Sequence, residues 1–120
     1  MGDLTKNFSI HEFACNCGCG EDGIDPALVI ILQSVRDRIA RRMVISSGVR
    51  CKEHNEEVGG VQNSEHITGY GVDVACSDSR MRYEIVSACM QAGVPRIGIG
   101  KRFVHIGVSP DHPKDVLWLY

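Results

Sequence analysis

The sequence predicts an α+β domain with a mostly antiparallel sheet and flanking helices, and three observations support this prediction. Apolar residues recur at helical spacing in two long segments, residues 25–42 and 79–92. Short β-branched or apolar runs follow each of these segments, and two of the later runs are joined tightly, as in a hairpin. Helices and strands alternate irregularly, which is typical of α+β proteins.

The chain has 120 residues, which indicates one domain over residues 1–120. Its net charge of −2 does not favour a nucleic-acid partner, and no apolar run approaches the roughly 18 residues that span a bilayer. The first residues lack the apolar stretch of a secretory signal, so we expect synthesis in a cytoplasm. We expect a monomer with neither a nucleic-acid nor a membrane partner.

Capping signals mark the helices in the first part of the chain. Ser9 and Glu12 form a capping box, which predicts a short helical segment. Residues 15–22 are rich in Cys and Gly and are expected to form an irregular loop. Asp25 is a good cap and Pro26 suits the first position of the first long helix.

Shorter elements fill the rest of the chain. Between the long helices we expect a strand over 43–47, a short helix over 51–58, a polar loop over 61–68 and a strand over 71–76. After Gly93 we expect a hairpin of strands 96–100 and 102–108, then a last strand over 116–120.

Two of these strands each carry one potential metal ligand opposite an apolar face. Because side chains alternate along a strand, Val72 and Val74 share one face and Asp73 points to the other. In the same way Val104 and Ile106 share a face opposite His105. Each ligand is flanked mainly by small residues, which leaves room for an ion and a substrate.

His66 precedes Asp73 across a turn that contains Gly69 and Gly71, and a chain that reverses there brings His66 beside Asp73. Two imidazoles and one carboxylate suit Zn²⁺, and three protein ligands leave the fourth position for water, as in catalytic zinc sites. Taken singly, a loop histidine is usually only solvated and an aspartate at a strand is usually a turn former. The spacing and the strand parity favour a ligand role more than either residue alone does, and they make His66, Asp73 and His105 the candidate zinc ligands.

Several motifs resemble the M15 family of D-Ala-D-Ala carboxypeptidase-like zinc peptidases. Residues 46–51 (SSGVRC) and 64–73 (SEHITGYGVD) match its pairing of S-G-x-R with S-x-H-x-x-G-x-x-x-D, and 103–105 (FVH) resembles its final ligand segment. Residues 12–15 and Trp118 resemble the short, phage-associated branch of the family.

The resemblance implies the fold shared by Hedgehog domains and DD-peptidases, with zinc at His66, Asp73 and His105. It implies hydrolysis of peptide bonds in peptidoglycan stem peptides, by a carboxypeptidase or an endopeptidase. Arg50 would act as the catalytic arginine that holds the substrate and polarises its carbonyl, although a structural salt bridge also explains an arginine there. Ser64 would bind the substrate or outer groups. A phage-encoded protein of this kind would need another factor to release it to the cell wall.

One departure from the family leaves the catalytic base open. Many M15 enzymes carry a glutamate three residues before the last zinc histidine, where this chain has Arg102, and others carry an acid two residues after it, where this chain has Gly107. Loop groups that could replace it are Glu65, Asp111 and His112. The alternative function is a non-catalytic, zinc-stabilised module that binds wall peptides or a partner protein. A cysteine-based redox protein is a more distant alternative.

Four of the six cysteines raise a separate question. Cys15, Cys17 and Cys19 alternate along the loop, and they could bind a second metal or form a disulfide with Cys51. Their spacing is tighter than the C-x₂₋₄-C of ordinary zinc knuckles. We therefore expect a packed loop with free thiols.

Overall fold

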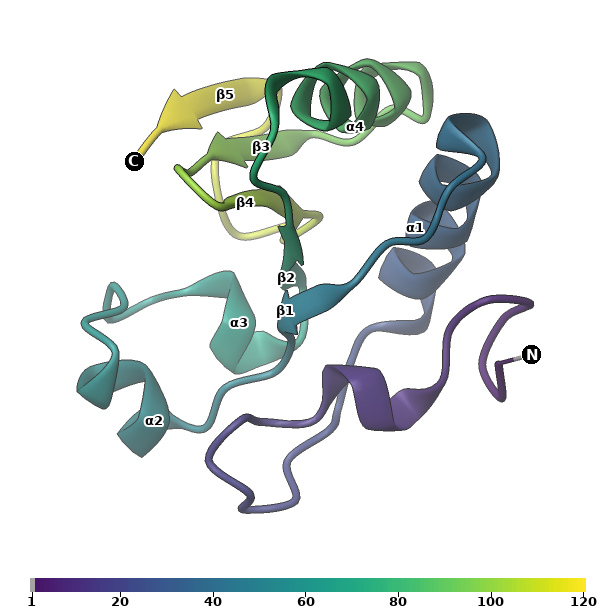
Figure 1. The fold of residues 1–120 in the computed structure, drawn as a ribbon. Helices are drawn as coiled ribbons and strands as arrows, with labels where there is room; N and C mark the ends of the chain where they lie inside the picture. Colours follow the sequence, from purple (N-terminus) through teal and green to yellow (C-terminus); the bar gives the residue numbers. More distant parts are fainter. Residues whose placement is uncertain (1) are drawn as a thin grey trace.

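The computed structural model describes residues 2–120, which form one five-stranded sheet with helices on both sides. Helices α1 and α4 lie on one side of the sheet, and the shorter α2 and α3 lie on the other (Figure 1). Among the described residues no helix is both long enough and apolar enough to cross a membrane. The elements are a 3₁₀ turn at Ile10–Phe13, α1 Pro26–Ile39, β1 Ile45–Ser47, α2 Lys52–Glu57, α3 Glu65–Thr68, β2 Gly71–Ala75, α4 Ser79–Gln91, β3 Arg96–Ile99, β4 Phe103–Gly107 and β5 Val116–Leu119.

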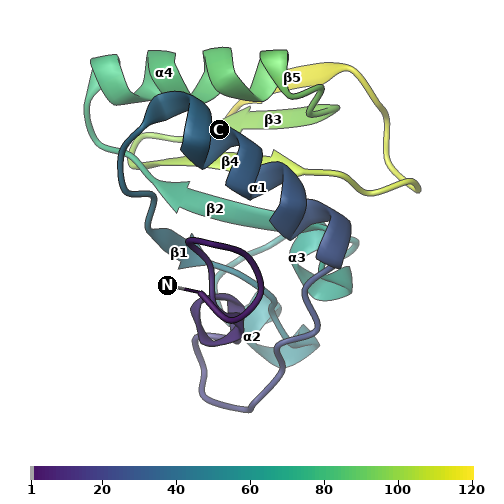
Figure 2. The same ribbon diagram turned by 90° about the vertical axis from the view of Figure 1, so that its right-hand side faces the viewer.

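The sheet is mixed, with strand order β1-β2-β4-β3-β5. The pairs β1–β2, β2–β4 and β3–β4 are antiparallel, which includes the hairpin expected from the sequence. The pair β3–β5 is parallel, so the sheet is not wholly antiparallel. The reason is topological: β4 already occupies one edge of β3, so the chain reverses after β4 and adds β5 to the outer edge of β3 (Figure 2).

Two helices differ from the sequence-based expectation. Helix α1 ends at Ile39 rather than near residue 42, because Ala40 adopts a left-handed conformation with φ 54°. The segment expected to be a polar loop contains the short helix α3, whose cap is Ser64 and whose end is Gly69 at φ 81°. A helix of four residues is too short to show apolar periodicity, so only its caps mark it in the sequence.

The core lies between the sheet and the pair of long helices. Val72 and Val74 of β2 and Val104 and Ile106 of β4 are fully buried, as strand alternation predicts. They belong to one apolar cluster with the inner faces of α1 and α4. The opposite face of β2 and β4 is therefore free to carry polar groups.

Removing Leu32 should test how far α1 stabilises this core. Leu32 is 0% exposed, so Leu32→Ala should lower the free energy of unfolding by about 2–5 kcal/mol. Chemical denaturation of both proteins measures the difference. The matched control is Ile30→Ala on the same helix, since Ile30 is 65% exposed and its loss should change stability little. Equal effects of the two substitutions would contradict this packing.

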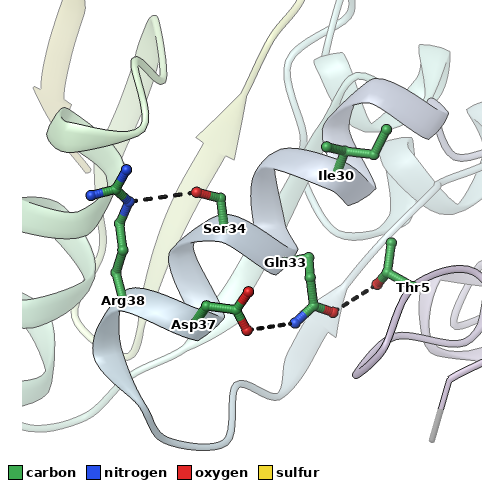
Figure 3. Close-up of a pocket in the computed structure, with 6 residues that line it drawn as sticks. All are labelled: Thr5, Ile30, Gln33, Ser34, Asp37 and Arg38. Carbon is green, nitrogen blue, oxygen red and sulfur yellow. Dashed lines mark hydrogen bonds between the residues drawn. The ribbon is translucent and has the colours of Figure 1, made fainter.

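A polar contact joins the N-terminal segment to α1. The Gln33 carboxamide oxygen accepts hydrogen bonds from the Thr5 hydroxyl and the Asn7 N–H, each at 2.8 Å, and its nitrogen donates to Asp37 at 2.9 Å. Figure 3 shows Gln33 between Thr5 and Asp37 in a hollow of about 500 Å³ on the outer side of α1. The hydrogen bonds to Gln33 therefore fix the N-terminal segment against α1.

Candidate metal centre

The structure brings His66, Asp73 and His105 together on the polar face of the sheet. Asp73 and His105 are direct partners in the β2–β4 register, as strand parity predicts. His66 comes from α3 and returns beside Asp73, so that one potential ligand atom from each of the three residues lies within 4.8 Å of the others. The side chains are nearly inaccessible, with residue exposures of 3%, 7% and 3%.

Two glycines make this convergence possible. Gly69 has φ 81°, a left-handed conformation that ends α3 and turns the chain into β2. At Gly71 a Cβ atom would lie only 2.8 Å from Cε1 of His105. The missing side chain at Gly71 therefore leaves space for the His105 ring on the neighbouring strand.

Outer hydrogen bonds set the tautomer of each histidine. Nδ1 of His66 lies 2.7 Å from the Gly48 carbonyl oxygen, so it donates there and leaves a lone pair on Nε2, 3.2 Å from Oδ1 of Asp73. Nε2 of His105 lies 2.9 Å from Oε1 of Glu65, so it donates there and leaves a lone pair on Nδ1, 3.0 Å from the same Asp73 oxygen.

In these tautomers two nitrogen lone pairs and a carboxylate oxygen face one another, an arrangement that a shared cation would satisfy. Zinc bonds of about 2.0–2.2 Å would place neighbouring ligand atoms about 3.4 Å apart, so the observed 3.0 and 3.2 Å call for only a small outward movement. A histidine that donates its outer N–H to a carboxylate is the usual support of a zinc ligand. The donor set and its surroundings fit Zn²⁺.

The local charges favour a cation at this position. Burial raises the pKa of Asp73, but the polar contacts with His105 and His66 outweigh it and hold that pKa well below its usual range. Burial lowers the pKa of His105, but the contacts with Asp73 and Glu65 outweigh it and raise that pKa. Both carboxylates stay ionised, so they attract positive charge to the inner nitrogens.

Glu65 is a component of the site that the sequence motif alone did not assign. It is 3% exposed, forms an ion pair with Nε of Arg96 at 2.9 Å and accepts a hydrogen bond from the Ser109 N–H at 3.0 Å. Burial raises the pKa of Glu65, but the contacts with His105 and Arg96 lower it to about 2. Glu65 thus contacts His105 on the side away from Asp73, and Arg96 and Ser109 fix its carboxylate there.

Gly107 is the sequence signal that could have located Glu65. A Cβ atom at Gly107 would lie 2.2 Å from Oε1 of Glu65, so the two positions share one space. The carboxylate of Glu65 occupies the space that a side chain at position 107 would fill, so Glu65 can be accommodated only with glycine at 107.

Arg50 approaches the site from the segment after β1. Its Nη2 lies 3.5 Å from Oδ2 of Asp73, while Nη1 donates to Asn55 at 3.0 Å and Nε donates to Ser47 at 3.2 Å. Ser64, the predicted substrate-binding residue, lines the cavity described below, and its hydroxyl oxygen accepts a hydrogen bond from the His66 N–H at 3.2 Å. Ser64 therefore fixes the start of α3, which carries His66.

The three residues line an open cavity of about 640 Å³. Of the loop groups considered as bases, Glu65 and His112 line this cavity and Asp111 does not. The Trp118 ring on β5 packs beside His105, with ring centroids 5.5 Å apart. The other lining residues are Arg50, Val58, Gly59, Gly60, Val61, Asn63, Ser64, Arg96, Phe103 and Tyr120. The cavity is large enough for a short peptide segment.

Comparison with known proteins gives one clear result. The family model described as Peptidase M15 matches residues 6–109. No curated protein matches the chain. The matched range contains Arg50, Ser64 and the three residues of the candidate metal centre, while β5 with Trp118 lies beyond it.

Proposed function

The chain belongs to the Peptidase M15 family, and on that basis we propose that it is a zinc-dependent peptidase that hydrolyses peptide bonds in peptidoglycan stem peptides. The reaction would be of the D-Ala-D-Ala carboxypeptidase or endopeptidase type. The observation that carries this proposal is the convergence of His66, Asp73 and His105 in the wall of one open cavity.

His66, Asp73 and His105 would hold the zinc ion. Zinc bound there supplies Lewis acidity, which activates water and polarises a peptide carbonyl. The chain's own contribution is to fix these ligands: the Gly48 carbonyl orients His66, and Glu65 orients His105. Such outer partners fix the tautomer and the ring orientation of the ligands.

Arg50 would stabilise the negative charge that develops on the substrate carbonyl oxygen. Its guanidinium lines the same cavity as the metal ligands and is held in place by Ser47 and Asn55. A fixed positive group that lies where charge develops lowers the barrier because it needs no reorganisation during the reaction. This is the catalytic role that we assign to Arg50.

Glu65 would be a positioning residue that replaces the acid absent from position 107. It accepts the His105 Nε2–H and is itself held by Arg96 and Ser109, so it controls the ring orientation of a metal ligand. Its engagement on several sides argues against a second role as the base that takes a proton from water. Glu65 therefore acts through His105 rather than on the substrate.

Exchanging the carboxylate between positions 65 and 107 should test this assignment. Glu65→Gln should weaken zinc binding about 10- to 100-fold, because an amide is a poorer acceptor for the His105 N–H. Gly107→Asp alone should also weaken it, because the new side chain overlaps Glu65. The double variant Glu65→Ala, Gly107→Asp should recover part of the affinity. Competition with a metal-sensitive dye measures all three proteins.

The matched control is Glu53→Gln in α2, an exposed glutamate outside the cavity, which should bind zinc as the unmodified chain does. Wild-type affinity in Glu65→Gln would contradict the positioning role. A double variant no better than Gly107→Asp would show that the two positions are not interchangeable.

A second candidate function is a zinc-stabilised module that binds wall peptides or a protein partner without cleaving them. The observation that favours it is the absence of a carboxylate at positions 102 and 107, together with the engaged state of Glu65. General acid–base catalysis contributes about 10²- to 10⁴-fold to such reactions, so its loss would leave little activity.

One assay separates the two candidates. Zinc-loaded protein is incubated with purified peptidoglycan, and new amino groups and free D-alanine are measured. Release of D-alanine indicates a carboxypeptidase, and new amino groups without D-alanine indicate an endopeptidase. Either product should disappear when a chelator removes the metal. Retention of zinc with no product would favour the binding module.

A further inference from the structure

A second cluster of potential ligands lies outside the cavity, where the loop after the 3₁₀ turn meets the start of α2. Cys15, Cys17, Cys19 and Cys51 each contribute a sulfur atom, and the four atoms lie within 4.8 Å of one another. The Cys15–Cys17, Cys17–Cys51 and Cys15–Cys51 sulfur distances are 3.5, 3.7 and 3.9 Å. The four cysteines are free, as expected from the sequence, and the structure also brings their sulfurs together.

We propose that Cys15, Cys17, Cys19 and Cys51 bind a second zinc ion as four thiolates. With a zinc–sulfur bond of about 2.3 Å, the edge of a tetrahedron of sulfurs is about 3.8 Å. The three distances of 3.5, 3.7 and 3.9 Å lie around this value. A disulfide would instead need a pair of sulfurs at about 2.05 Å, whereas all four cysteines are free.

The loop conformation explains how so tight a spacing can form a metal site. Alternate residues of an extended chain point the same way but stand too far apart to share one ion. Here Gly18, at φ 83°, lets the chain turn between Cys17 and Cys19. The Gly18 N–H donates to the Cys15 carbonyl at 3.1 Å, and the Cys15 N–H donates to Glu21 at 2.7 Å, which closes the loop.

Backbone donors also point at the sulfurs. The Cys51 N–H donates to the sulfur of Cys15 at 3.5 Å, and the His54 N–H donates to the sulfur of Cys51 at 3.4 Å. Hydrogen bonds to a negatively charged acceptor are stronger than those to a neutral one, so these contacts favour thiolates over thiols. Zinc binding displaces the proton of each thiol, and the four sulfurs then complete its coordination.

The site would be structural, because four protein ligands leave no position for a substrate. Its effect on the rest of the molecule follows from the neighbours of Cys51. Arg50 precedes it directly, and the Arg50 N–H donates to the carbonyl of His66 at 2.9 Å. A metal that ties the loop to Cys51 would therefore anchor the segment that places Arg50 beside Asp73.

Metal analysis and cobalt spectroscopy test this proposal without relying on activity. Protein purified without added reductant should contain two zinc ions per chain, and the Cys17→Ser, Cys19→Ser double variant should contain one. After exchange with Co²⁺, the intact chain should show the sulfur-to-cobalt charge-transfer absorption of a thiolate site. The double variant should lack this absorption, whereas Asp73→Asn should keep it, since only the other site is altered.

The matched control is Cys76→Ala, which removes a buried cysteine outside the cluster and should leave both ions and the absorption in place. A thiol reagent applied to the unfolded, chelator-treated protein should count six thiols. A count of four would reveal a disulfide and overturn the proposal, as would a cobalt protein without charge-transfer absorption. The cobalt absorption, the thiol count and the difference of one zinc ion between the two proteins are independent of hydrolysis and of metal at His66, Asp73 and His105.

Discussion

Asp73→Asn should bind zinc at the candidate metal centre at least about 100-fold more weakly than the unmodified chain, and should not hydrolyse peptidoglycan. Removing a hydrogen-bond partner of a metal ligand lowers the affinity for the metal about 10- to 100-fold, so removing the charge of a ligand itself should lower it further. Asp73 is the central group of the site, because its Oδ1 lies 3.0 Å from His105 and 3.2 Å from His66. Competition with a metal-sensitive dye measures the affinity.

The control for Asp73→Asn is Asp37→Asn, an equal chemical change at an exposed position on α1. Asp37→Asn should retain both zinc and activity. If Asp73→Asn bound zinc at this centre as tightly as Asp37→Asn, the metal would not be held by the three residues that we propose.

Arg50→Ala should lower kcat/KM on peptidoglycan fragments by about 10²- to 10³-fold while zinc binding stays nearly complete. This is the size of loss that follows removal of one group that stabilises an oxyanion. The loss should fall mainly on kcat, because the charge that Arg50 would stabilise develops in the transition state. Steady-state kinetics and metal analysis of the same samples separate these effects.

Arg50→Lys provides the comparison. It keeps the positive charge but cannot hold Asn55 and Ser47 together with a planar fork, so its activity should lie between the other two proteins. The competing explanation for Arg50 is a structural salt bridge with Asp73. That explanation predicts lower stability or lost zinc in Arg50→Ala, with an unchanged kcat for the fraction that keeps its metal.

The pairing of Asp73 with His105 could be predicted because strand alternation is a strong local rule. Once Val72, Val74, Val104 and Ile106 are assigned to the core, Asp73 and His105 must point to the other face. The structure confirms that they are cross-strand partners. The position of His66 is less strongly determined, because it depends on a turn that Gly69 and Gly71 permit but do not dictate, and the family motif adds support for it.

Glu65 could not be placed in the same way, because its role depends on contacts between distant segments. It lies in the short helix α3, for which the sequence pattern predicts a loop. Its partners His105 and Ser109 are 40 and 44 residues away in the chain. Its sequence position beside His66 suggested only that it could approach a metal. The overlap between the Glu65 carboxylate and a side chain at position 107 can be recognised only when the two segments are packed together.

The cysteine cluster and the direction of β5 were also beyond the sequence argument. Ordinary ligand spacing argued against a metal at Cys15, Cys17 and Cys19, but that argument did not include the backbone freedom of Gly18. The pairing of β5 with β3 depends on which sheet edge remains free after the hairpin has formed. Local patterns predict a strand over its residues but contain no information about that edge.

The two oxygens of the Asp73 carboxylate face different partners, since Oδ1 faces the histidines and Oδ2 faces Arg50. A bound peptide whose own oxygen attracts the guanidinium would leave Oδ2 less neutralised and the whole carboxylate more basic. The affinity of the site for the cation would then rise. By thermodynamic reciprocity, the bound cation would raise the affinity for the peptide by the same factor. Occupancy of the cavity and retention of the ion are thus linked through one side chain.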